Sequence, residues 1–203
     1  MSALEFMSVG AAGDQGAFHP VARSSLERRF REAGATFEER DGWLVPVGVP
    51  GETERLGNVG VADLSYLTKF EVRPAGDPLD GVEGTVWYRI SPRRALVLCA
   101  PPLAQKVREQ ASDRLVLDVT GALSIIAVVG PEADTVLRRL THIHHFPSGG
   151  EVAHVTAHVL QRGGGYWLLF AQELGHYMSE VVLDRAEALG GGLVGIDALG
   201  AAS

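Results

Sequence analysis

Histidines are the residues of this chain best suited to bind a metal or move a proton, and three of them stand together. His142, His144 and His145 directly follow a stretch with helical spacing. Three imidazoles within four residues could help to hold zinc or another borderline metal. The same residues suit a polar loop at the negative C-terminal end of a helix, and the loop has no Asp, Glu or Cys. A polar loop is the favoured interpretation, and a His-loop metal-binding protein stays an alternative.

Two further histidines, His154 and His158, lie four residues apart in a stretch expected to be one strand over 152–160. On a strand this spacing places both rings on one face, together with Thr156. The helical His-Glu-x-x-His pattern of metalloproteases does not occur, because position 155 is valine. We therefore interpret them as part of a polar sheet face.

An aromatic pair, Trp87 and Tyr88, is followed by Arg89, Arg93 and Arg94 around an expected turn between two strands. Aromatic rings beside arginines could hold a flat anionic ligand by stacking and carboxylate pairing. A solvated hairpin tip is the simpler interpretation of the same residues.

The motifs of three other kinds of site are absent from the sequence. The glycine triplets 163–165 and 190–192 lack the lysine and the strand-to-helix setting of a phosphate loop, so they indicate turns. A Gly-x-Ser-x-Gly nucleophile motif does not occur. The single cysteine, Cys99, excludes a disulfide framework and lies in an apolar run over 95–100 that indicates an inert thiol in a buried strand.

Composition limits the class of protein. The 203 residues are 46% hydrophobic and 21% charged, which is typical of a packed globular chain. The formal net charge of −7 argues against a nucleic-acid binder with a generally basic surface. The N-terminus lacks the basic start of a secretory signal, and the most apolar stretch, 122–129, is too short to span a bilayer. We expect a cytoplasmic protein without a membrane span.

The elements that must position these residues begin after an expected flexible leader over 1–22. A helix is predicted from Ser24 to the stop at Gly34, followed by strands over 35–39 and 43–47. Asp41-Gly42 between these strands is a hairpin turn signal. A single domain is expected over 23–199.

A repeat organises the rest of the chain. Asp63-Leu64-Ser65 and Asp118-Val119-Thr120 are 55 residues apart, and each precedes a strand that starts five residues after the aspartate. We interpret each aspartate as the entry to its strand, where its side chain can cap the local turn. Two such triplets with matching strands predict an internal repeat, with copies at about 63–119 and 118–196.

The second copy is predicted as strand 123–129, helix 131–140, strands 152–160 and 166–171, helix 174–189 and strand 193–196. This β-α-β-β-α-β order defines a split βαβ, or ferredoxin-like, unit. The first copy is predicted as strands 68–73, 85–90 and 95–99, helix 102–111 and strand 114–119, without the first helix. The expected fold class is α+β, with two fused ferredoxin-like halves of which the first is trimmed.

Three stretches resemble the folate-binding aminomethyltransferase superfamily, which includes the glycine-cleavage T-protein and the gamma subunit of heterotetrameric sarcosine oxidase. The first is Gly42-Trp43-Leu-Val-Pro46, followed by Asp63-Leu-Ser65 and Lys69-Phe-Glu-Val72. The second is Tyr88-Arg-Ile-Ser-Pro-Arg-Arg-Ala-Leu-Val-Leu98. The third is Val129-Gly-Pro-Glu-Ala-Asp-Thr-Val-Leu137 with Gly195-Ile-Asp-Ala-Leu199.

The resemblance implies a tetrahydrofolate site between the halves and, in T-proteins, transfer of a one-carbon unit from an aminomethyl-lipoyl group. It implies a catalytic role for Glu83, and the cofactor-binding residues that it implies are Asp63, Tyr88, Arg89, Arg162 and Trp167. The family's Asp-Asp pair aligns with Glu83-Gly84, and its folate-binding glutamate segment aligns with 162–168, which has no carboxylate. The T-protein's C-terminal barrel domain has no counterpart in this sequence.

The segment Leu117–Pro131 and the length are closer to the sarcosine oxidase gamma subunit, which packs on larger flavin-containing partners. The resemblance therefore implies a binding or subunit protein of one-carbon metabolism with altered catalytic positions. Its partners would be larger flavin-containing oxidase subunits or a lipoylated carrier protein. An active tetrahydrofolate-dependent aminomethyltransferase is the alternative.

Overall fold

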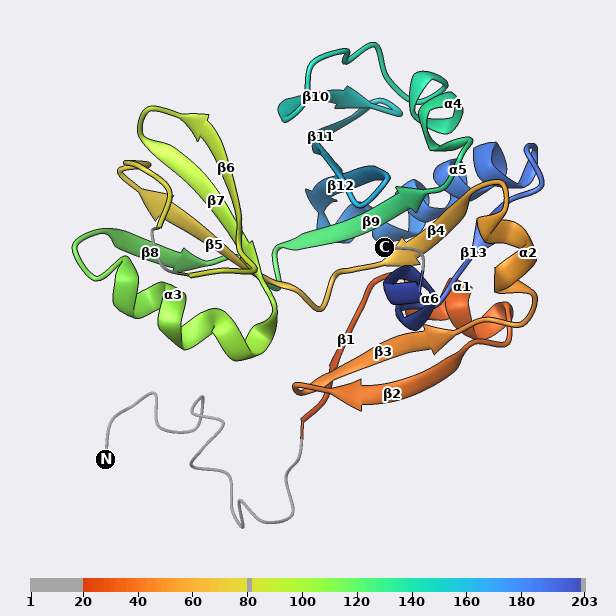
Figure 1. Cartoon of the computed structure of the whole chain (residues 1–203), viewed down its shortest axis with the longest axis horizontal. Helices are drawn as coiled ribbons and strands as arrows, with labels where there is room; N and C mark the ends of the chain where they lie inside the picture. The colour runs from red at the N-terminus through yellow and green to blue at the C-terminus, as the bar shows by residue number, and fades with distance from the viewer. Residues whose placement is uncertain (1–19, 80–81, 202–203) are drawn as a thin grey trace.

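The computed structural model describes residues 20–79 and 82–201, which form an α+β structure with three sheets (Figure 1). The expected leader over 1–22 lies almost wholly outside the described residues. No helix in the described part of the chain is long and apolar enough to cross a membrane.

The N-terminal part forms a small sheet in the order β1-β3-β2. Its elements are β1 (Ala22–Arg23), α1 (Glu27–Glu32), β2 (Thr36–Arg40), β3 (Trp43–Gly48) and α2 (Glu52–Leu56). The predicted hairpin is confirmed, because Arg40 pairs with Trp43 and the two turn residues have φ of 51° at Asp41 and 76° at Gly42. Both angles are those of a two-residue turn that follows the twist of its strands.

A six-stranded mixed sheet forms the centre of the molecule, in the order β10-β11-β12-β9-β4-β13. Its strands are β4 (Gly60–Asp63), β9 (Leu123–Val129), β10 (Ser148–Val152), β11 (Val155–Arg162), β12 (Gly165–Ala171) and β13 (Gly192–Leu193). One face packs against α1, α4 (Ala133–Arg138) and α5 (Gly175–Glu187) around Phe30, Ile126 and Met178. A last helix, α6 (Ile196–Ala201), lies beside β3.

A four-stranded antiparallel sheet in the order β6-β7-β5-β8 covers the other face of the central sheet (Figure 1). Its elements are β5 (Thr68–Arg73), β6 (Val86–Ser91), β7 (Arg94–Cys99), the 3-10 turn Pro101–Leu103, α3 (Ala104–Gln110) and β8 (Leu115–Asp118). Leu96 and Leu98 of β7 meet Ile125 and Leu169 of the central sheet. The opposite face packs on α3 through Phe70 and Val107. Because successive side chains of a strand point to opposite faces, the four-stranded sheet packs against the central sheet on one face and against α3 on the other.

Both aspartate triplets form the predicted local turns. The Ser65 N–H donates to Asp63 Oδ1 at 2.9 Å, and the Thr120 N–H donates to Asp118 Oδ1 at 3.0 Å. Each aspartate, however, ends a strand, β4 or β8, whereas the sequence interpretation put it at a strand entry. The reason is that the residues before each triplet, 60–63 and 115–118, pair with a neighbouring strand.

The strands next to the two triplets are hydrogen-bonded to each other in pairs. The strand β4 before the first triplet pairs with β9 after the second, and β8 before the second pairs with β5 after the first. Ile125 accepts a bond from the Leu64 N–H at 2.9 Å and donates to Ser65 Oγ at 3.0 Å. Lys69 makes the same two bonds with the second triplet. Each half therefore completes the sheet that begins in the other.

Two predicted strands differ markedly from the structure. The stretch 152–160 is not one strand, because the chain reverses at Ala153 and His154, which have φ of 48° and 64°. His154 and His158 consequently do not share a strand face. The predicted strand 193–196 is only the two residues of β13, and Ile196 begins α6. The short elements β1, β4, β10, α2 and α6 were not predicted, since each has too few residues for a periodic pattern.

Candidate functional site

A cavity of about 240 Å³ lies at the junction of the two halves. It is lined by the segment after the first aspartate turn, by the β9 and β12 ends and by α6, with the residues Leu64, Tyr66, Leu67, Val129, Gly163, Trp167, Ile196 and Leu199. Most of these side chains belong to the apolar layer between the two large sheets. The cavity is therefore a largely apolar space whose polar character comes from two aromatic residues.

Those two residues are Tyr66 and Trp167, and both are half-buried. The guanidinium of Arg162 lies 5.9 Å from the centre of the Trp167 ring, where it can interact with the ring's negative face. Of the expected cofactor residues, Trp167 thus lines the cavity, and Arg162 contacts the Trp167 ring without lining the cavity itself. Flat rings and a cation of this kind suit an aromatic ligand.

The charges near Tyr66 belong to Arg40 and to its ion-pair partners, one of which lies on α6. Arg40 donates to both carboxylate oxygens of Asp197, at 2.6 and 2.9 Å, and also binds Glu38. Burial raises the pKa of Tyr66 and outweighs the opposing effect of the nearby Arg40 charge. The tyrosine is therefore a neutral hydroxyl at physiological pH, able to donate a hydrogen bond to a ligand.

Tyr88 belongs to the same apolar layer but does not line the cavity. Its hydroxyl lies 3.1 Å from Nδ1 of His158, and the two rings meet edge to face with centroids 5.2 Å apart. Burial lowers the pKa of His158, and the Arg94 charge acts in the same direction. A neutral imidazole suits this contact, which joins β6 of one sheet to β11 of the other.

The arginines that follow Tyr88 do not gather into one anion site. Arg89 is exposed and donates to the Gly76 carbonyl. Arg94 binds the carboxylate of buried Glu71, at 2.7 Å from Nη2 to Oε2, and this holds the pKa of Glu71 below its usual range. Trp87 packs instead on the α3 side, since neighbouring strand residues face opposite ways. The hypothetical flat-anion site of 87–94 is not assembled.

The expected acid, Glu83, is exposed in the turn before β6. Its neighbour Val82 packs into the α3 layer, on the far side of the four-stranded sheet from the cavity. The structure thus does not bring Glu83 and the cavity residues together.

Asp63 is buried, with 2% of its surface exposed, and is not among the cavity residues. Burial raises the pKa of its carboxyl group, opposed by the hydroxyls of Ser24 and Ser65 and by the charge of Lys69. Lys69 is fully buried and donates to the Ser65 carbonyl at 2.7 Å, and burial lowers its pKa to about 8. Both groups lie under the first turn, where the charge of Asp63 partly offsets the effect of burial on Lys69.

The histidine loop after α4 does not converge on a metal. Within residues 20–79 and 82–201, no three His, Cys, Asp or Glu side chains are placed to hold a metal ion. Cys99 is buried in β7, as predicted, and burial raises the pKa of its thiol to about 11. The cavity between the halves therefore remains the candidate site.

Sequence reasoning missed Tyr66, Ile196 and Leu199 as lining residues. Tyr66 directly follows the first aspartate triplet. An aromatic residue at the end of such a turn could have indicated a ligand-binding position. Ile196 and Leu199 are three residues apart, which is a helical spacing, but one turn is too short to separate from a strand.

Comparison with known proteins identifies the fold. No protein-family model matches the sequence, and no curated protein matches it either. Among solved structures, the glycine cleavage system aminomethyltransferase T from Bartonella henselae matches 88% of this chain with a TM-score of 0.68 and 16% identity. This chain spans only 61% of that aminomethyltransferase.

A second solved structure, heterotetrameric sarcosine oxidase from Corynebacterium sp. U-96, matches 83% of this chain and 96% of the compared oxidase chain. The TM-score is 0.60 at 15% identity. The two matches confirm, at the level of fold, the resemblance that the sequence motifs indicated. The chain therefore shares its fold with aminomethyltransferase T of the glycine cleavage system and with a chain of heterotetrameric sarcosine oxidase.

Proposed function

We propose that this chain is a binding or subunit protein of one-carbon metabolism, with one domain over 23–199 built from two ferredoxin-like halves. The single observation that carries the proposal is the aromatic cavity at the junction of the halves, in a fold shared with aminomethyltransferase T. The site would hold the flat ring of a tetrahydrofolate-like ligand against Trp167 and Tyr66.

The fit of tetrahydrofolate to the lining residues is partial. The rings of Tyr66 and Trp167 fit a flat heterocycle, but none of the residues that line the cavity is a carboxylate. A pterin edge that is buried without such a partner would lose about 1–3 kcal/mol of binding free energy. Because the cavity is also smaller than the roughly 300–1,000 Å³ of most ligand sites, we expect weak binding of the ring alone.

The same observations favour a non-catalytic role over aminomethyl transfer. General acid catalysis needs a proton-donating group within hydrogen-bond reach of the reacting atoms, and the family resemblance assigns that role to a carboxyl group. Glu83, the acid that the family resemblance implies, is exposed in the turn before β6 and is not among the residues that line the cavity. The match to 96% of a sarcosine oxidase chain supports a subunit that packs on larger flavin-containing partners.

The ligand part of the proposal is tested by calorimetric titration of the full chain with 5-formyltetrahydrofolate. We expect weak saturable binding that Trp167→Ala abolishes and Trp167→Phe largely keeps, because phenylalanine retains a stacking face. Trp87→Phe, on the far side of the four-stranded sheet, is the matched control. No heat of binding up to millimolar ligand would rule out the folate part.

The subunit part is tested by co-expression with the large subunits encoded by neighbouring genes, followed by light scattering on the purified complex. A complex of fixed stoichiometry with a flavin-containing chain is the expected result. A monodisperse chain that never joins such a complex, together with glycine-cleavage activity toward a lipoylated carrier that Glu83→Gln destroys, would favour the aminomethyltransferase instead.

A further inference from the structure

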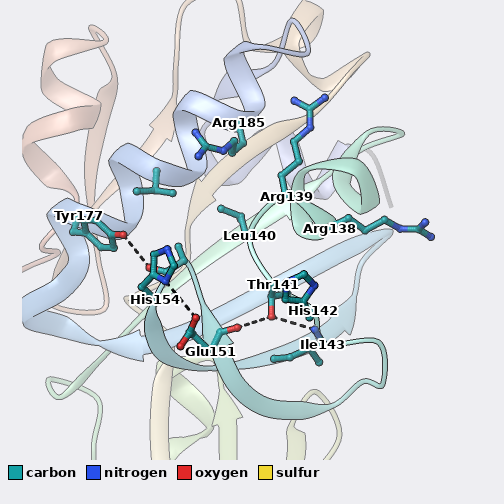
Figure 2. Close-up of a pocket in the computed structure, with 12 residues that line it drawn as sticks. Arg138, Arg139, Leu140, Thr141, His142, Ile143, Glu151, His154, Tyr177 and Arg185 are labelled. Carbon is teal, nitrogen blue, oxygen red and sulfur yellow. Dashed lines mark hydrogen bonds and ion pairs between the residues drawn. The ribbon is translucent and has the colours of Figure 1, made fainter.

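A second cavity, of about 530 Å³, lies on the side of the central sheet that α4 and α5 cover, and Figure 2 shows the side chains that line it. It is formed by the end of α4, the β10–β11 turn and α5, with the lining residues Arg138, Arg139, Leu140, Thr141, His142, Ile143, Glu151, Ala153, His154, Tyr177, Val181 and Arg185. Its volume falls in the range of about 300–1,000 Å³ that is usual for small-molecule sites.

The charge of this cavity is opposite to that of the whole chain. Three arginines and two histidines line it against one carboxylate, Glu151, in a protein with a formal net charge of −7. Arg138 extends away from the other side chains in Figure 2 and pairs with Asp134 at 2.7 Å. Arg185 also contacts its neighbour Asp184, and His154 Nδ1 lies 3.3 Å from Glu151 Oε1, whereas Arg139 makes no ion pair among the described contacts. Arg139, whose side chain extends away from the β10–β11 turn in Figure 2, is thus the cation that a ligand on the helix side can reach.

The walls of the cavity are fixed by hydrogen bonds between its three elements. The Ala153 N–H donates to the Leu140 carbonyl at 2.7 Å, which joins the β10–β11 turn to the segment after α4. The Tyr177 hydroxyl donates to the Ala153 carbonyl at 2.9 Å and joins the same turn to α5 (Figure 2). A ligand would therefore enter a preformed space and would not have to order it.

The β10–β11 turn places two residues other than glycine at positive φ, which costs conformational free energy. Asp41-Gly42 and Gly163-Gly164 provide residues that accept a positive φ, but Ala153 and His154 take φ of 48° and 64° with ordinary side chains. Asn-Gly is preferred in such a turn, and alanine in particular rarely adopts a positive φ. Cations at helix C-termini account for Arg138 and Arg185, but they do not account for a strained histidine at the cavity rim.

We propose that this cavity binds a small organic oxyanion, a phosphate or carboxylate group carried on an apolar body. Arg139 and Arg185 would bind the charged group from the helix side, with His154 on the turn side. Arginine suits this role because its planar fork matches the oxygens of phosphate and carboxylate. Leu140, Val181 and the 41%-exposed Tyr177 offer the apolar wall that a bare inorganic ion would not need.

The test titrates the full chain with phenyl phosphate, benzoate, phenol and inorganic phosphate, and measures binding by calorimetry and ligand-observed NMR. We expect phenyl phosphate or benzoate to bind at least about tenfold more tightly than phenol, because the charged group adds charge-assisted hydrogen bonds. The stronger of the two anions identifies the oxyanion. Inorganic phosphate should bind more weakly than phenyl phosphate, since it lacks the apolar body.

Two variants decide whether the cavity is responsible. Arg139→Gln should weaken binding of the preferred anion about tenfold, whereas Arg93→Gln, which removes an exposed arginine at the β6–β7 turn, should leave it unchanged. His154→Gly should raise the midpoint of urea unfolding and still weaken the anion's binding, because glycine relieves the turn and removes the imidazole. Phenol binding as tightly as the anions, or anion binding unchanged in Arg139→Gln and His154→Gly, would overturn the proposal.

Discussion

The two aspartate turns, Asp63-Leu64-Ser65 and Asp118-Val119-Thr120, have the same local hydrogen bonds in opposite surroundings. Asp63 is 2% exposed and shares its buried site with the Lys69 cation. Asp118 is half exposed and pairs with Arg108 at 2.8 Å. The comparison shows that one sequence motif can serve a buried junction in one copy and a solvated strand end in the other. The cost of breaking each turn should differ accordingly.

The largest difference is expected when the aspartates themselves are removed. Asp63→Ala should lower the free energy of unfolding by about 3–4 kcal/mol, since it removes the acceptor of the buried Ser65 N–H and the carboxyl group whose charge offsets that of buried Lys69. Asp118→Ala should cost less than about 1 kcal/mol, because water can replace the lost contacts. Urea unfolding monitored by circular dichroism measures both. Equal losses would show that burial does not separate the two turns.

The buried cation predicts a pH dependence that only the first turn should show. Lys69 has a pKa of about 8 in the folded chain and an ordinary value of 10.5, so the unfolded chain holds more protons between these two values. The folded state should therefore gain stability as the pH rises from 8 to 10.5, by up to about 3 kcal/mol relative to Lys69→Met.

Lys106→Met, at an exposed position on α3, is the matched control and should follow the native pH profile. Subtracting each variant's unfolding free energy from that of the native chain cancels the tyrosines and Cys99, which titrate in the same range. If the difference in unfolding free energy between the native chain and Lys69→Met stays constant from pH 8 to 10.5, Lys69 has an ordinary pKa and its ammonium group is accessible to water.

A smaller difference between the two turns is expected when the hydroxyl group of Ser65 or Thr120 is removed. Ser65→Ala leaves the buried Ile125 N–H without its acceptor and should cost about 2 kcal/mol. Thr120→Ala removes the equivalent acceptor of the Lys69 N–H at a half-buried site, with an expected cost of about 1 kcal/mol. Chemical denaturation gives both values, and a greater loss for Thr120→Ala would reverse the proposed order of the two turns.

The smallest effect is expected at the exposed ion pair of the second turn. Arg108→Lys keeps the charge near Asp118 but loses the guanidinium that lies 4.4 Å from the centre of the Phe70 ring. We expect a loss of about 0.5 kcal/mol, because exposed pairs contribute little. Thermal unfolding at low and high salt checks this value, and a loss above that of Ser65→Ala would contradict the comparison.

Long periodic elements and turn residues were predictable from sequence because their patterns are local. The strands 68–73 and 123–129 were predicted with the bounds that the structure shows. The Asp41-Gly42 hairpin and both aspartate turns also formed as expected. The hairpin at Ala153-His154 was missed, since neither residue is a turn former and only pairing with β11 makes the reversal favourable.

The candidate site was only partly predictable. Trp167 and Arg162 were expected at a ligand, and the structure sets them beside each other, with Trp167 alone lining the cavity. Tyr88 was grouped with the arginines that follow it, but its contact is His158, 70 residues away on the other sheet. Sequence spacing cannot reveal such a pair, because strands distant along the chain meet only through the stacking of sheets.

The sequence by itself determined the α+β class, the repeated aspartate turns and the apolar strands that follow them. Those features depend on alternation of side chains and on hydrogen bonds between residues two positions apart. Only the tertiary structure decided that β4 pairs with β9 and β8 with β5, so that the copies are interleaved. Strand partners are chosen by burial of whole faces, and that choice made Asp63 a buried charge and left Asp118 in water.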